Sequence, residues 1–95
     1  MIFMSRSDFI FFDALGHRYK DKAEEFEQAK NFVCAATNYT VAGECFGKAD
    51  EIARSDMMID HGETRAKKEY CERKTKEMQE KSREQQSSVA RHSSK

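Results

Sequence analysis

The fold is decided by residues 39–53, which read YTVAGECFGKADEIA. Five of these residues recur at steps of three and four: Tyr39, Ala42, Phe46, Ala49 and Ala53. This spacing places them on one face of an α-helix, and it predicts an amphipathic helix from residue 39 to about 57. Gly43 and Gly47 lie inside the pattern, although glycine costs about 1 kcal/mol relative to alanine in a helix. We therefore expect a neighbouring backbone to pack closely against them.

A second amphipathic pattern precedes this one and covers residues 18 to about 37. Its apolar positions again step by three and four: Tyr19, Ala23, Phe26, Ala29, Val33 and Ala36. Asn38 lies between the two patterns and can cap a helix that begins after it. The sequence predicts an antiparallel helical hairpin over residues 18–58. Its predicted core consists of Ala23, Phe26, Ala29, Val33, Tyr39, Ala42, Gly43, Phe46 and Ala49.

Residues 1–17 are predicted to form an apolar N-terminal arm, in which a short helix is broken by Gly16. Its large apolar residues are Phe9, Ile10, Phe11, Phe12 and Leu15. Two interpretations remain open for them. In one, Phe9, Phe11, Phe12 and Leu15 insert shallowly at a membrane surface. In the other, the arm packs on the open face of the hairpin.

Residues 63–84 predict a third helix of a different kind. Glu63–Lys67, Glu72–Lys76 and similar pairs four residues apart support helix formation. The apolar positions are few: Ala66, Tyr70, Cys71 and Met78. A helix that is polar nearly all round either projects into solvent or is marginally stable. Residues 85–95 are rich in glutamine and serine, and we expect a disordered tail there.

The composition narrows the class of protein to a small all-α domain. The chain has 95 residues, 17 basic and 17 acidic side chains, and no proline. A net charge of zero gives no general attraction to nucleic acid. Cys34, Cys45 and Cys71 are odd in number and widely spaced, which favours free thiols in a reducing compartment over a disulfide scaffold. We therefore expect a cytoplasmic protein.

The sequence offers little for catalysis or for metal binding. His17, His61 and His92 have no ligand spacing relative to one another or to the cysteines. A helical hairpin has little room for a pocket of several hundred Å³. We expect no enzyme activity, no catalytic residue, no metal and no cofactor.

The predicted hairpin resembles a tetratricopeptide repeat, in which alanines and aromatics pack two helices together. Residues 36–49, ATNYTVAGECFGKA, are similar to the first repeat of the soluble NSF attachment proteins, the SNAP family. Upstream, residues 18–26, RYKDKAEEF, resemble the start of that family's first helix, and residues 11–16, FFDALG, resemble its apolar loop. The chain departs from the family at Thr37, where lysine is common, and SNAP proteins are about three times longer.

The resemblance implies a non-catalytic adaptor that binds SNARE-type helical bundles in vesicle fusion, with peripheral membrane contact through the apolar loop. The alternative is a small accessory helical subunit buried in a larger assembly. A single hairpin leaves one side of each helix bare, and repeats of this type need about three copies for stability. The arm, the third helix, a second copy of the chain or a partner helix must cover that side.

Overall fold

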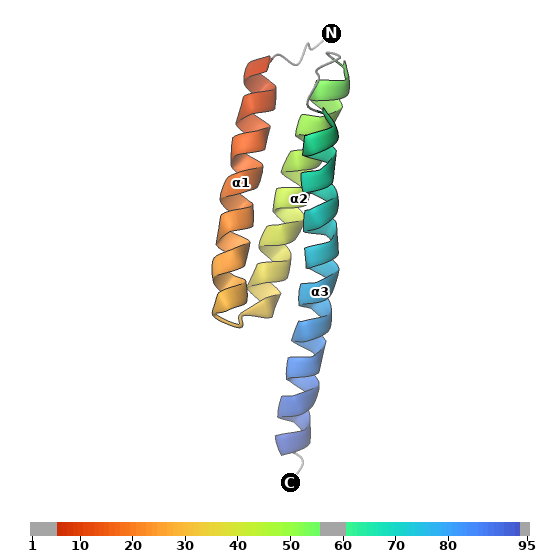
Figure 1. Cartoon of the computed structure of the whole chain (residues 1–95). Helices are drawn as coiled ribbons and strands as arrows, with labels where there is room; N and C mark the ends of the chain where they lie inside the picture. Colours follow the sequence, from red (N-terminus) through yellow and green to blue (C-terminus); the bar gives the residue numbers. More distant parts are fainter. Residues whose placement is uncertain (1–5, 56–60, 94–95) are drawn as a thin grey trace.

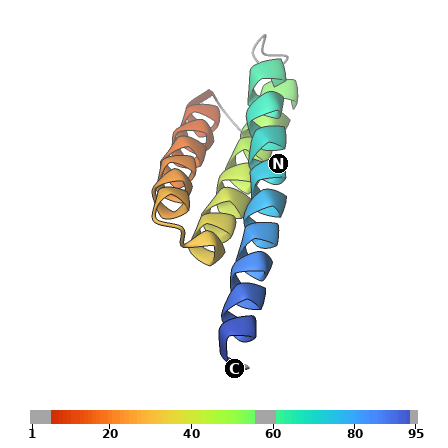
Figure 2. The same ribbon diagram turned by 60° about the horizontal axis from the view of Figure 1, so that its bottom comes forward.

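The computed structural model of the protein describes residues 6–55 and 61–93, and these residues form three helices. They are α1 (Arg6–Gln28), α2 (Phe32–Ser55) and α3 (His61–Ser93). The all-α expectation is confirmed, and α1 and α2 form the predicted hairpin. α2 lies in the middle, with α1 and α3 antiparallel to it on either side (Figure 1). α3 continues beyond the turn between α1 and α2 (Figure 2).

The turn between α1 and α2 lies at residues 29–31, so the predicted break at Asn38 is wrong. The Asn31 N–H donates to the Phe26 carbonyl (2.9 Å) and the Lys30 N–H to the Glu27 carbonyl (3.0 Å). These two bonds close a Schellman motif at the end of α1. The Asn31 side chain then caps α2, because its Oδ1 accepts from the Cys34 N–H at 3.3 Å.

α2 is continuous through Asn38 because its polar side chains bond to the helix itself. The Asn38 amide donates to the Cys34 carbonyl at 2.8 Å, and the Thr37 hydroxyl donates to the Val33 carbonyl at 3.1 Å. Their hydrogen bonding is satisfied without ending the helix. The turn that the SNAP resemblance implies in residues 36–39 is therefore absent from this structure.

The backbone of Lys30 is strained at this turn. Its φ is 62°, a left-handed conformation that costs a non-glycine residue about 1–2 kcal/mol. Lys30→Gly should therefore raise the free energy of unfolding by about 1 kcal/mol, measured by urea denaturation. Lys22→Gly, at an exposed position inside α1, should lower it by a similar amount. A Lys30→Gly variant no more stable than the native chain would contradict the strain.

The predicted arm is wrong for residues 6–17, because these residues form the first turns of α1. Gly16 does not break the helix but permits close packing. A Cβ atom at position 16 would lie 2.7–2.9 Å from three ring carbons of Phe46. The ring therefore occupies the space that any larger residue would need. Residues 1–5 of the predicted arm, 56–58 of the predicted hairpin and 94–95 of the predicted tail lie outside the described residues.

The predicted core is correct from Tyr39 to Ala49 and partly wrong before Tyr39. Six predicted core residues are buried: Ala23, Tyr39, Ala42, Gly43, Phe46 and Ala49. Phe26 is half-buried and packs against this cluster. Ala29 and Val33 are wrong, because Ala29 is exposed in the turn and the Val33 side chain is 57% exposed. Moving the break from Asn38 to residues 29–31 places Val33 in the first turn of α2, where it faces away from α1.

α3 packs along α2, so projection into solvent, one of the two alternatives for residues 63–84, is wrong. The third helix is one of the segments expected to cover the hairpin, and it does so on the α2 side. Thr64, Cys71 and Met78 are spaced by seven residues and are all buried. A Cβ atom at Gly43 would lie 3.4 Å from the Cβ of Cys71, and one at Gly47 would lie 3.5 Å from Cε of Lys68. The close neighbour predicted for these glycines is therefore α3. The helix also includes residues 85–93, so the disordered tail predicted there is wrong.

Candidate interaction surfaces

Three lysines of α3 cover the aromatic residues of the hairpin. The Nζ atoms of Lys67, Lys74 and Lys81 lie 5.6, 5.6 and 5.7 Å from the ring centroids of Phe46, Tyr39 and Phe32, respectively. In such contacts the lysine stem covers apolar surface and the ammonium group faces a ring. The packing of these lysines on aromatic rings was not predicted from the sequence, although their seven-residue spacing places them on one face of a helix.

Glu27 connects all three helices. Its carboxylate accepts from the Tyr39 hydroxyl of α2 at 2.8 Å and from Nζ of Lys74 of α3 at 2.9 Å. Burial alone would raise the pKa of Glu27, but these two hydrogen bonds lower it below the usual 4.5. Burial and the bond to Glu27 raise the pKa of Tyr39. Lys74 also donates to Glu77 at 2.6 Å. This cluster stabilises the packing of α1 and α3 against α2.

The lowered pKa of Glu27 predicts loss of stability in acid. Its contribution is present above the unfolded-state value of about 4.5 and is lost as the pH falls through the lower folded-state pKa. We expect Glu27→Gln to show a smaller fall in urea midpoint between about pH 6 and about pH 3 than the native chain. Glu80→Gln, at an exposed position of α3, is the control. An unchanged acid dependence in Glu27→Gln would contradict this role.

Lys67 joins α1 and α3 at the other end of the bundle. Its Nζ lies 3.0 Å from Oδ1 of Asp13 and 2.9 Å from Nε2 of His17. The His17 ring packs edge-to-face on Phe46, with 5.1 Å between the ring centroids. The His17 ring therefore packs against Phe46 and lies beside the ion pair of Asp13 and Lys67. These contacts give it a structural role.

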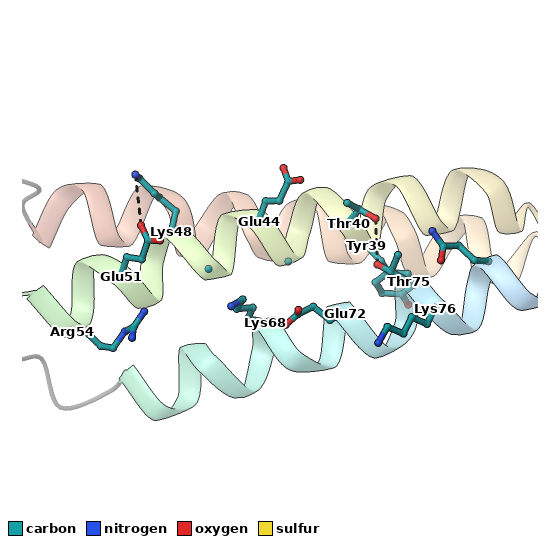
Figure 3. Close-up of a pocket in the computed structure, with 13 residues that line it drawn as sticks. Tyr39, Thr40, Glu44, Lys48, Glu51, Arg54, Lys68, Glu72, Thr75 and Lys76 are labelled. Atoms are coloured by element: carbon teal, nitrogen blue, oxygen red, sulfur yellow. Dashed lines mark hydrogen bonds and ion pairs between the residues drawn. The ribbon is translucent and has the colours of Figure 1, made fainter.

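A groove of about 630 Å³ runs between α2 and α3, so the expectation of little room for a pocket of several hundred Å³ is wrong. Gly43 and Gly47 line it together with charged residues of both helices, such as Lys48 of α2 and Lys68 of α3 (Figure 3). Lys68 and Glu72 extend from α3 toward the space between the two helices in that view. On the α2 side, Lys48 pairs with Glu51 at 3.8 Å.

The apolar residues at the start of α1 divide into an outward and an inward set. Ile10 and Phe11 are 59% and 58% exposed, whereas Phe9, Phe12 and Leu15 are half-buried. The rings of Phe11 and Phe12 meet edge-to-face with centroids 5.2 Å apart. We call these five residues the apolar tip. The exposure of Ile10 and Phe11 fits insertion at a membrane surface. The partial burial of Phe9, Phe12 and Leu15 fits packing on the hairpin.

The three cysteines are free thiols, and Cys45 and Cys71 are buried. Burial raises the pKa of Cys71 to about 11 and raises that of Cys45 as well. A thiol that stays protonated at neutral pH is a poor nucleophile. Among the residues that the structure describes, no three histidine, cysteine or carboxylate side chains are grouped to hold a metal ion.

Within residues 6–55 and 61–93, no helix is long and apolar enough to cross a membrane. Comparison with known proteins found no matching family model, no matching curated protein and no matching solved structure.

Proposed function

We propose that the protein is a non-catalytic adaptor of the cytoplasm, a helical interaction module whose α2–α3 groove receives a helix of a partner protein. The observation that carries this proposal is that several charged side chains along the groove lack an ion-pair partner in the described part of the chain. Glu44, Lys68, Glu72 and Lys76 line it and have no ion-pair partner among the described residues. A partner helix with charges of opposite sign would pair with them, which favours specific over non-specific contacts.

The resemblance of residues 18–26 and 36–49 to SNAP proteins makes a SNARE-type helical bundle the first partner to test, with a role in vesicle-mediated transport. Peripheral membrane contact belongs to the same proposal. Ile10 and Phe11 are exposed and apolar, and burying each side chain in a bilayer interface would contribute about 1.5–3 kcal/mol.

A pulldown of a SNARE helical bundle by the full chain tests the partner. Reversing charge in the groove with Lys68→Glu plus Lys76→Glu should weaken binding at least tenfold, because two groove contacts become repulsive. Arg73→Glu, an exposed α3 position outside the groove, is the matched control and should bind as the native chain does. Absence of binding, or equal binding by all variants, would contradict the proposal.

Liposome co-sedimentation tests the membrane contact separately. Ile10→Ser plus Phe11→Ser should leave the melting temperature unchanged, because both side chains are largely exposed, and should reduce liposome binding at least tenfold. A fall in melting temperature with no liposome binding by the native chain would instead favour packing of the tip.

The second candidate is an accessory helical subunit buried in a larger assembly. It is favoured by Val33, which is 57% exposed beside a hollow that Ala36, Thr37 and Arg83 also line. Co-purification of the native chain in a stable complex that Val33→Glu disrupts, with no binding to SNARE bundles, would favour this alternative.

A further inference from the structure

α1 has an outward stripe of exposed residues that no other helix of the described residues covers. α1 and α3 flank α2, and neither α2 nor α3 lies on the far side of α1 (Figures 1 and 2). The members of the outward stripe are Phe11, Ala14, Arg18, Asp21, Lys22, Glu25 and Ala29. Ala29 continues the helical turn, because its N–H donates to the Glu25 carbonyl at 3.1 Å.

The charges of the outward stripe alternate in sign along the helix. Arg18 and Lys22 are like charges four residues apart, and so are Asp21 and Glu25. Arg18 and Asp21, and Lys22 and Glu25, are opposite charges three residues apart, so the like and opposite pairs largely offset each other. None of these four side chains has an ion-pair partner among the described residues. On the neighbouring face of α1, by contrast, Lys20 and Glu24 pair at 3.2 Å.

A second copy of the outward stripe, placed antiparallel, complements the first. We propose that two copies of the chain associate in this way about a two-fold axis near Asp21 and Lys22. In this register Arg18 lies opposite Glu25 of the second copy, and Asp21 lies opposite its Lys22. Two-fold symmetry repeats each contact, so the interface contains four pairs of opposite charge between the two copies.

The apolar members of the outward stripe fit the same register. Ala14 lies opposite Ala29 of the second copy, and small residues at both positions allow the helices to approach closely. A patch that is complementary to itself indicates a second copy rather than an unrelated protein. The α2–α3 groove lies away from this interface and remains open.

Charge reversal tests the dimer without depending on the groove. Sedimentation of the full chain should show a concentration-dependent dimer that weakens as salt rises. Arg18→Glu should weaken association at least tenfold, because the carboxylate introduced at position 18 then faces Glu25 of the second copy. Within its own helix the same change gains a favourable pair with Lys22 and loses the one with Asp21, and position 18 is exposed, so circular dichroism should show an intact fold. Glu25→Arg should weaken association to a similar extent. Arg73→Glu, outside the stripe, should not change it.

An equimolar mixture of Arg18→Glu and Glu25→Arg chains gives the decisive result. Each variant alone sets like charges against each other. In a mixed dimer, the carboxylate introduced in one chain lies opposite the guanidinium introduced in the other, and the remaining Glu25 lies opposite the remaining Arg18. The mixture should recover dimerisation to within about threefold of the native chain.

Recovery in the mixture cannot come from contact within one chain, because positions 18 and 25 are about 10 Å apart along the helix axis. Three results would each overturn the proposal. They are a native chain that is monomeric at all concentrations, single variants that dimerise normally, and a mixture that stays monomeric.

Discussion

Phe46→Ala is expected to lower the free energy of unfolding by about 3–5 kcal/mol, the range for removing a fully buried aromatic side chain. Phe46 has no exposed surface, and its ring fills the space beside Gly16 and packs against His17. A domain of this size has little more stability than this to lose. Circular dichroism at room temperature should therefore show that most of the helical signal has disappeared.

Phe11→Ala provides the control for the loss at Phe46. The two residues have the same side chain, but Phe11 is 58% exposed. Its replacement should change the melting temperature of the monomer by little, because it leaves no internal cavity. Equal effects of the two substitutions would show that Phe46 is not at the centre of the hairpin.

Met78→Ala is expected to cost about 2–5 kcal/mol and to loosen α3 from the hairpin. Met78 has no exposed surface and belongs to the core cluster that connects α2 with α3. Hydrogen exchange should show faster exchange of α3 amides than of α1 and α2 amides in this variant. Glu80→Ala, two residues along the same helix and exposed, should leave exchange unchanged.

The outcome of Met78→Ala distinguishes a packed α3 from the solvent-projecting helix that its polar pattern predicts. A polar helix that projects into solvent would lose nothing on this substitution. A helix that packs along α2 through Thr64, Cys71 and Met78 would lose one of these buried contacts. An unchanged urea midpoint would therefore contradict the packing of α3.

The periodicity of residues 39–53 is enough to predict the buried face of α2. Tyr39, Ala42, Phe46 and Ala49 are buried as expected, because a helix fixes which residues share a face before any partner is present. Gly43 and Gly47 also indicate a close neighbour correctly. They do not show which neighbour, because glycine permits close approach by any backbone or side chain.

The position of the turn cannot be read from local signals. Asn31 and Asn38 are both able to cap a helix, and the side chains around Asn38 are equally able to bond within one. The structure places the turn at residues 29–31, and α2 then buries Ala35 and Ala36. Burial of this apolar surface, which depends on contacts between helices, selects one capping site over the other.

The all-α class and the buried face of α2 can be derived from the amino-acid sequence, because both follow from helical periodicity and the absence of proline. The place of α3 depends instead on tertiary packing. Its pattern is polar, and its buried residues include a threonine and a cysteine. Lys67, Lys74 and Lys81 cover the rings of the hairpin with their stems and keep their charges at the surface. A lysine counted as polar in a sequence pattern thus contributes apolar packing, and this becomes visible only when an aromatic ring from another helix lies beneath it.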